Sequence, residues 1–364
     1  MNILVVNTPV GALGSGLGGG VERTLCSLVA GLLERGHGLT VLAAEGSLLP
    51  PRCGRAALWH EPGVAQPSWQ HQHRDAPVQI PAGSLLAALW RRALAEQHHF
   101  DVMLNLGYDW LPLWLTPMAT TPLAHLVSMG SVSAAMDGLI AQISASHHRH
   151  LAFHTASQAA DFELSGPPLL LGNGFDLDQY AFQPEPLPQL GWAGRIAPEK
   201  GLEDAAAAAA ALDLPLVVMG LVEDQTYAAQ VAASVPPTTL LWKGFLEPAA
   251  LQAELGRCRA LLNTPKWNEA FGNVIVEALA CGVPVASYAR GGPAELVQEG
   301  RNGALAKADD VADLVAACQR AMAIERSDCR QWAEQHGSLA GLATRVEAWL
   351  EAVVDAAATD PIGS

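Results

Sequence analysis

An alternation of short apolar runs and amphipathic stretches, repeated in two halves of the chain, limits the folds open to this sequence. Residues 2–7 are a continuous apolar run, which is typical of a strand buried on both faces of a parallel sheet. A glycine-rich loop, a predicted helix over 21–35 and a second predicted strand over 39–44 follow. This strand–loop–helix–strand unit predicts a doubly wound α/β domain.

The same alternation begins again after a proline-rich connector at 183–188. Strands are expected over 190–193 and 216–219, with an alanine-rich helix over 201–212 between them. Because each half repeats the pattern, we predict two Rossmann-like doubly wound domains with a central cleft.

These patterns divide the chain into three expected segments. An N-terminal domain is expected over 1–180 and a C-terminal domain over 181–338. The segment 339–364 is expected to hold a helix that crosses back onto the N-terminal domain, and its tail, 358–364, is expected to be loose.

Composition excludes several classes of function. The 364 residues include 36 acidic and 21 basic ones, a net charge of −15, whereas nucleic-acid binding needs a basic footprint. Residues 1–180 contain no lysine, which disfavours docking on anionic lipid, and no apolar run reaches the ~18 residues of a membrane span. Dispersed cysteines and an N-terminus without a cationic leader predict a cytoplasmic protein with reduced thiols. Small-molecule partners are expected, and the oligomeric state stays open.

The most informative string runs from Glu269 to Glu277, with seven residues between the two glutamates. Gly272 precedes the predicted helix, where a glycine lets a ligand approach backbone N–H groups that favour anions. Glu277 lies among apolar residues, and a buried carboxylate needs partners such as the vicinal hydroxyls of a ribose. The alternative is that both glutamates only stabilise the first half of the helix.

This string resembles the E-x7-E signature of the retaining, two-domain GT-B glycosyltransferases of family 4, and the resemblance covers most of the chain. Segment 190–201 resembles the family's Gly-Arg…Glu-Lys-Gly segment, which implies that Arg195 and Lys200 stabilise a leaving diphosphate. The resemblance further implies a UDP-glucose donor, with Glu277 on the ribose and Glu269 orienting the hexose. Other implied donor contacts are Phe271, Gly272, Asn273 and Val274. No cofactor is expected and metal is expected to be dispensable, because the two cations fill its role.

The glycine-rich loop before the first helix has two interpretations. Gly14 to Gly19 satisfies the G-x-G-x-x-G pattern and Glu45 follows the second strand, so an NAD-dependent oxidoreductase is one alternative. However, a dinucleotide turn has its first glycine at the end of the strand, and Gly14 lies well beyond it. The segment 19–22 resembles the family's Gly-Gly-x-Glu loop, which implies backbone contacts with the donor phosphate. The glycines concerned are Gly16, Gly18, Gly19 and Gly20.

The predicted acceptor half departs from the family pattern. Ser128 or Met129 stands where the family commonly has a cleft histidine, and His125 lies within a predicted strand, where a core role is the alternative. The strings 108–113 and 125–131 resemble cyanobacterial UDP-glucose:tetrahydrobiopterin α-glucosyltransferases, which implies transfer to a hydroxyl of the pterin side chain. A pteridine needs aromatic faces, for which core packing is the alternative, and a carboxylate for its amino-pyrimidine edge. The candidate contacts are Tyr108, Asp109, Trp110, His125, Met129 and Asp137.

A group of histidines and a pair of arginines could suggest other binding sites, and two other functions stay open. No cysteine or acidic cluster joins the histidines between 147 and 154, so no metal site is expected there. A family 4 enzyme acting on a saccharide or lipid-linked acceptor stays open, as does a non-catalytic nucleotide-sugar binding protein. The arginine pair at 91–92 is interpreted as part of a solvated helix face.

Overall fold

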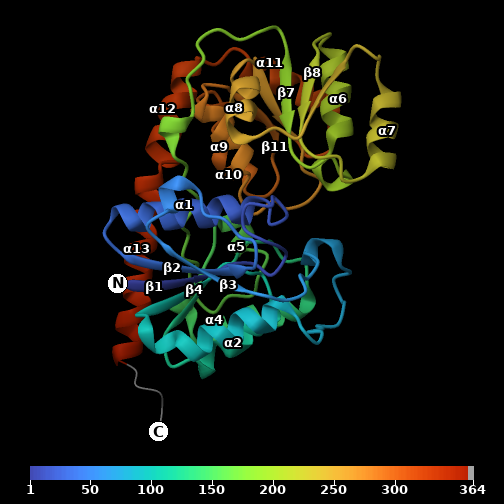
Figure 1. The fold of residues 1–364 in the computed structure, drawn as a ribbon. Helices are drawn as coiled ribbons and strands as arrows, with labels where there is room; N and C mark the ends of the chain where they lie inside the picture. Colours follow the sequence, from blue (N-terminus) through green and yellow to red (C-terminus); the bar gives the residue numbers. More distant parts are fainter. Residues whose placement is uncertain (360–364) are drawn as a thin grey trace. The chain divides into compact units, whose positions relative to one another are not determined.

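The computed structural model describes residues 1–359 and divides the chain into two compact units, each built around its own sheet (Figure 1). The first unit comprises Met1–Gly174 and the chain from Leu339 onward, and the second comprises Phe175–Ser338. The division falls at Gly174, six residues before the expected boundary at 180. Phe175 already belongs to the second unit, where its N–H donates to the carbonyl of Gly337 at 2.8 Å.

The sheet of the first unit has six parallel strands in the order β3-β2-β1-β4-β5-β6. The central strand β1 is buried on both faces: Ile3 and Val5 point to one hydrophobic cluster, and Leu4 and Val6 point to another. This double burial is the reason for the continuous apolar run at the start of the chain. The strands are β1 (Asn2–Val6), β2 (Gly38–Ala44), β3 (Ala57–Glu61), β4 (Val102–Asn105), β5 (Leu123–Leu126) and β6 (Leu151–Ala152).

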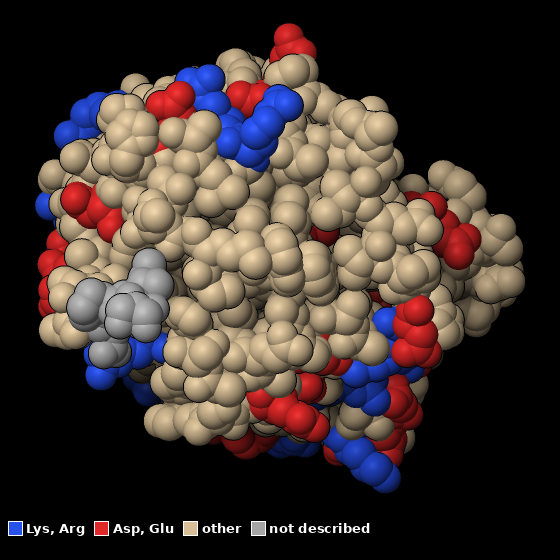
Figure 2. Space-filling view, turned by 90° about the horizontal axis from the view of Figure 1, so that it is seen from below, with Lys and Arg blue, Asp and Glu red and all other residues tan. Residues whose placement is uncertain are grey.

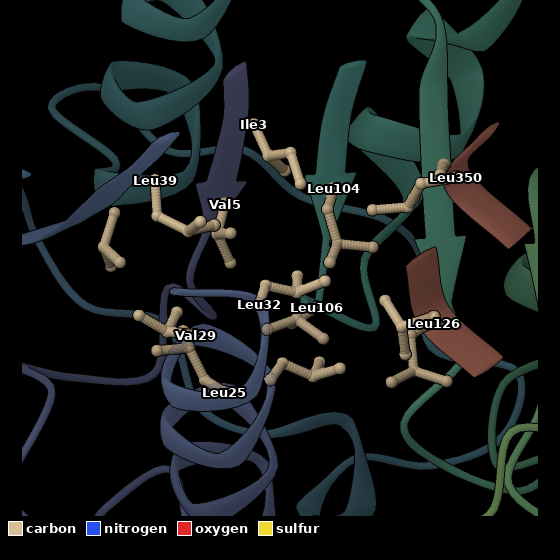
Figure 3. Packing of buried hydrophobic residues seen from close by; sticks show 14 of the residues in the cluster. Ile3, Val5, Leu25, Val29, Leu32, Leu39, Leu104, Leu106, Leu126 and Leu350 are labelled. Carbon is tan, nitrogen blue, oxygen red and sulfur yellow. The ribbon is translucent and has the colours of Figure 1, made fainter. Parts of the chain in front are cut away.

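Helices cover both faces of this sheet. Figure 3 shows Leu25, Val29 and Leu32 of α1 pointing towards the strand residues Val5 and Leu104. The C-terminal helix α13 lies beside α1 and completes this face, and the remaining helices lie against the opposite face and its edge. The helices are α1 (Gly20–Glu34), α2 (Leu85–Glu96), α3 (Trp110–Leu115), α4 (Ala134–Ser146), α5 (Ala156–Ala159) and α13 (Leu339–Thr359).

The sheet of the second unit repeats the first, with six parallel strands in the order β12-β11-β10-β7-β8-β9. Helices α6, α7 and α11 pack on one face, and α8, α9 and α12 pack on the other. The strands are β7 (Leu190–Ala193), β8 (Leu216–Met219), β9 (Leu240–Gly244), β10 (Ala260–Asn263), β11 (Val285–Tyr288) and β12 (Gly303–Ala306). The helices are α6 (Leu202–Ala211), α7 (Gln225–Ser234), α8 (Pro248–Gly256), α9 (Asn273–Ala280), α10 (Pro293–Leu296), α11 (Val311–Ala321) and α12 (Arg326–His336).

The two parallel sheets confirm the predicted α/β class and the doubly wound topology of each half. The alanine-rich helix forms as α6, and its small side chains are buried against the sheet. Residues 358 and 359 end α13, and the remainder of the tail that was expected to be loose, 360–364, lies outside the described residues. Strand β3 was not predicted, because a partly exposed edge strand lacks a continuous apolar run.

Charged side chains are sparse on part of the molecular surface. On the face shown in Figure 2, Lys, Arg, Asp and Glu lie mainly near the margin, around a broad centre of other residue types. Within residues 1–359, no helix combines the length and the apolar character that crossing a membrane requires.

The contact between α1 and α13 generates the first prediction. A Cβ atom added at Gly31 of α1 would lie 2.8 Å from the Cβ of Ala343 in α13. We expect Gly31→Ala to lower the free energy of unfolding by about 1–3 kcal/mol, because overpacking forces the helices apart. Gly138 in α4 has open space around it, so Gly138→Ala is the matched control and should stabilise by about 0.5–1 kcal/mol. Denaturant unfolding measures both, and equal shifts would contradict this account of the contact.

Candidate functional site

The second sheet changes its direction of winding between β7 and β10. From β7 the chain builds outward through β8 and β9, then returns to place β10 on the other side of β7. Ligands of open α/β sheets bind beyond the carboxyl ends of the strands at such a switch point. Two loops begin there, 194–201 and 264–272. Of the residues predicted to contact the donor, they contain Arg195, Lys200, Glu269, Phe271 and Gly272.

A backbone contact holds these two loops together. Gly201 has a φ of +65°, and a Cβ atom there would lie 2.1 Å from the carbonyl oxygen of Thr264. The Thr264 hydroxyl donates to the Gly201 carbonyl at 2.8 Å, and the Lys266 N–H donates to the Glu199 carbonyl at 2.8 Å. Only glycine permits this approach, so the Lys-Gly pair of the sequence motif is a structural requirement of the site.

The loops bring Lys200 and Glu269 into contact. The Lys200 ammonium lies 3.0 Å from Glu269 Oε1 and 5.1 Å from the ring centroid of Trp267. The two charged side chains are only 17% and 22% exposed, so the pair is partly shielded from water. Lys200 is therefore a cation fixed beside the residue that was predicted to orient the hexose.

Arg195 lies on the same loop and is also paired with carboxylates. Its guanidinium donates to Glu199 at 2.9 Å and to Glu223. Both carboxylates are about one-third exposed, so water screens these interactions and each pair is weak. An arriving diphosphate would offer stronger, bidentate acceptors to the same guanidinium.

The loop that carries Glu269 packs on a pair of glycines. Gly292 donates its N–H to the Glu269 carbonyl at 2.7 Å, and Gly291, with a φ of +63°, leaves no room for a Cβ atom. Gly272 is the N-cap of α9, has a φ of +97° and provides no side-chain cap. This geometry exposes the start of α9 at the same edge as Lys200, and Phe271 is buried just before it.

Glu277 lies inside α9 and is 5% exposed. The hydroxyl of Tyr180 donates to its Oε1 at 3.2 Å. The expected burial of this carboxylate is confirmed, whereas its contact with a ribose stays a prediction. Tyr180 was missed in the sequence because it lies in an irregular segment before the second sheet.

A second set of charges fixes the loop after β10, and no sequence motif predicted it. Lys266 pairs with Asp204 and, at 3.1 Å, with Asp309. Tyr288 donates to Asp204 at 2.6 Å, and Arg290 donates to the carbonyl of Pro265 at 2.9 Å. These side chains come from four segments, so only the fold brings them together.

The glycine-rich loop of the first unit is organised around Glu22. Its carboxylate, 9% exposed, accepts the N–H groups of Gly14 at 2.8 Å, Gly16 at 3.4 Å and Gly18 at 2.8 Å. In this arrangement the N–H groups of Gly16 and Gly18 are already satisfied, so contact with a donor phosphate requires the loop to rearrange. The gap between β1 and Gly14 also rules out the tight dinucleotide turn.

The first sheet has its own switch point, between β1 and β4. Asp109 follows β4 and is 6% exposed, and the indole N–H of Trp69 donates to its Oδ1 at 2.9 Å. Burial raises the pKa of Asp109 to about 7, and the Trp69 hydrogen bond opposes part of that rise. The carboxyl group thus changes charge near neutral pH.

The other acceptor candidates lie nearby in sequence but differ in environment. Tyr108 is buried, and Trp110 stacks on the half-exposed Trp114 with ring centroids 5.5 Å apart. Met129 is partly buried, and its carbonyl accepts from the side chain of Gln158 at 2.9 Å. Asp137, in the first turn of α4, pairs with Arg74.

His125 is a core residue. It is 1% exposed, and its ring nitrogens lie 3.1 Å from the amide nitrogen of Asn105 and 2.8 Å from the hydroxyl of Thr116. Burial lowers its pKa to about 3, so the ring is neutral. This environment favours the core interpretation over the acceptor contact that was predicted for it.

Asn7 was missed by the sequence interpretation. It directly follows β1, is 2% exposed, and neither polar atom of its side-chain amide has a hydrogen-bond partner. A buried amide without partners is costly, which points to a bound molecule or water at this strand end. A polar residue directly after the first buried strand was the available signal.

Comparisons with known proteins agree with this geometry. Residues 179–336 match the family described as Glycosyl transferases group 1. The match covers most of the second unit. A D-inositol 3-phosphate glycosyltransferase of Geodermatophilus obscurus is 29% identical, over 88% of this chain and 81% of the relative. A GDP-mannose-dependent alpha-mannosyltransferase of Mycolicibacterium smegmatis is 36% identical, but over only 35% of this chain and 32% of the relative.

Solved structures show the same fold over the whole chain. The Anabaena protein HepE, solved with UDP-glucose, superposes with a TM-score of 0.71 at 19% identity, covering 97% of this chain and 100% of that one. AviGT4, a glycosyltransferase involved in avilamycin A biosynthesis, has a TM-score of 0.72 at 19% identity, with 98% of each chain covered. The solved structures show a GT-B fold, and the partial family match and the relatives, named as glycosyltransferases, support a hexosyltransferase enzyme and do not favour the oxidoreductase alternative.

The environment of Asp109 generates a pH prediction. The folded pKa of about 7 exceeds the ordinary value of 3.8, so the folded chain binds the extra proton between these limits. Stability from this group is therefore highest below about pH 4 and decreases as the pH rises to about 7, by at most about 4 kcal/mol. We expect Asp109→Asn to flatten the pH dependence of unfolding across this window. A variant that keeps the wild-type slope would refute the raised pKa.

Proposed function

We propose that this enzyme transfers glucose from UDP-glucose, with retention of configuration, to a side-chain hydroxyl of tetrahydrobiopterin. The observation that carries the donor half of the proposal is the contact of Lys200 with Glu269 beside the start of α9. It joins a cation, a carboxylate and a helix N-terminus at the switch point of one sheet, where a diphosphate and a sugar need them.

Each donor-site residue has a distinct role in the proposal. Lys200 and Arg195 stabilise the charge that develops on the leaving diphosphate. Glu269 and the backbone from Phe271 to Val274 orient the hexose, and Glu277 accepts hydrogen bonds from the ribose hydroxyls. In the proposal these two cations fill the place of a metal.

The chemistry then needs no dedicated protein base. The acceptor hydroxyl attacks the sugar carbon C1 on the face that the phosphate leaves, so the new C–O bond forms as the bond to UDP breaks. The departing phosphate oxygen takes the proton of the hydroxyl, and the products are the α-glucoside and UDP. This route is compatible with the burial of His125 in the core.

The acceptor half of the proposal rests on the loops after β4. A pteridine is planar and rich in N–H groups, and these loops combine stacked indoles at Trp110 and Trp114 with the carboxyl group of Asp109. The relatives are named for GDP-mannose and for D-inositol 3-phosphate, so a mannosyl donor or an inositol acceptor is the competing outcome.

The donor roles predict how two variants behave. Lys200→Met should lower kcat for UDP release about 100- to 1000-fold, because the leaving diphosphate loses its cation. Glu277→Gln should raise the KM for UDP-glucose about tenfold, because a ribose acceptor is lost. Lys307, an exposed lysine after β12, is the control, and Lys307→Met should leave both constants unchanged. Unchanged UDP release by Lys200→Met would exclude this mechanism.

Product analysis tests the whole reaction. Incubation with UDP-glucose and tetrahydrobiopterin should give a pterin heavier by one hexosyl group, with the same yield in the presence of EDTA. Parallel reactions with GDP-mannose and with myo-inositol or D-inositol 3-phosphate cover the competing outcome. A product only with one of these compounds would disprove the proposed substrates but not the transferase activity.

A further inference from the structure

Buried polar atoms that lack a hydrogen-bond partner gather at one edge of the first sheet. Of the eight such side-chain atoms among the described residues, five belong to Asn7, Tyr108, Ser133 and Asp137. Asn7 follows β1, Tyr108 follows β4, and the other two lie at the start of α4, which follows β5. The carboxyl ends of parallel strands share one edge of a sheet, and this is where open α/β sheets bind ligands.

Three of these residues lie close together. Tyr108 packs in the same hydrophobic cluster as Met136 of α4, the neighbour of Asp137. Burial and the charge of Asp137 raise the pKa of the Tyr108 phenol, and the backbone of Ser133 opposes part of that rise. Ser133 precedes α4 but makes no side-chain cap, and its backbone carbonyl accepts the N–H of Asp137 at 3.0 Å. Tyr108 is 6% and Ser133 0% exposed, so bulk water does not satisfy their hydroxyls.

The charges around Tyr108, Ser133 and Asp137 determine which ligand groups these residues can bind. Arg74 pairs with Asp137 Oδ2 and donates to the carbonyl and the hydroxyl of Ser131 at 2.8 Å each, so its cation is already engaged. The other carboxylate oxygen, Asp137 Oδ1, is buried and has no hydrogen-bond partner among the described residues. The carboxylate oxygen accepts from a hydrogen-bond donor and repels a phosphate, and the two hydroxyls can accept from the same donor.

We infer that Tyr108, Ser133 and Asp137 form an acceptor subsite that binds an amino group of an uncharged substrate and discriminates against phosphorylated acceptors. This inference rests on the proposed function, since it assigns the acceptor to the first unit. It adds Ser133 to the site and separates the roles of the two carboxylates: Asp137 binds the amino group, and Asp109 accepts a hydrogen bond from Trp69.

Acceptor kinetics with tetrahydrobiopterin as the probe test the subsite. Tyr108→Phe and Ser133→Ala should each raise the acceptor KM about tenfold, the effect of one lost hydrogen bond. The KM for UDP-glucose and the slow hydrolysis of UDP-glucose without acceptor should not change. Ser144→Ala is the control, because Ser144 is buried in the same helix and binds only the N–H of Ser165, at 2.8 Å. An unchanged acceptor KM in both variants would overturn the inference.

Direct binding separates this inference from the proposed reaction. Calorimetric titration of the wild-type enzyme with tetrahydrobiopterin, myo-inositol and D-inositol 3-phosphate requires no turnover. Binding of the pterin that Tyr108→Phe weakens, without a glucosylated product, would contradict only the proposed reaction. Stronger binding of D-inositol 3-phosphate than of both neutral compounds would overturn the subsite. So would a crystal structure of the pterin complex in which only an ordered water contacts Tyr108 and Ser133.

Discussion

The approach of Gly201 to the carbonyl of Thr264 is the contact on which the donor site depends. It sets the loops after β7 and β10 side by side, so that Lys200 on one loop meets Glu269 on the other. The left-handed backbone at Gly201 and the missing side chain are both needed, because any Cβ would meet that oxygen. The sequence motif around Lys200 is therefore as much a packing motif as a chemical one.

Charge pairing gives the site its second constraint. The chain has a net charge of −15, so the cations predicted to bind a diphosphate are few. Without a ligand they need counter-charges, because an unpaired cation would bind other anions non-specifically. Here Arg195 is held by carboxylates that are about one-third exposed, where such pairs are weak, and Lys200 is held by Glu269 in a pair that is partly shielded from water. A diphosphate that displaces these carboxylates would pair with two cations that are already in position. The ion pairs therefore keep Arg195 and Lys200 in place until the diphosphate binds.

The sequence predicted what local periodicity determines. The buried strand β1, the alanine-rich α6 and the burial of Glu277 all follow from patterns within a few residues. Contacts between distant segments could not be predicted from local patterns. Trp69 lies 40 residues from Asp109 in the sequence, and Lys266 pairs with Asp204 of a different segment. Glu22 shows the same limit. A family-like Gly-Gly-x-Glu string indicated a phosphate-binding loop. The structure shows that the glutamate of this string accepts the backbone N–H groups of that loop.

The two sheets use one topology for different chemistry. Each has a switch point beside its central strands, and candidate residues follow the strands at or next to it. In the second unit these residues are ions in pairs, suited to a nucleotide diphosphate. In the first they are neutral hydroxyls and amides with a carboxylate, many of them without a partner. An unsatisfied polar group is expensive to bury, so a fold keeps such groups only where a ligand or water repays the cost. Specialisation for the acceptor is therefore expected in the first unit, and it is there that the chain departs from the family pattern.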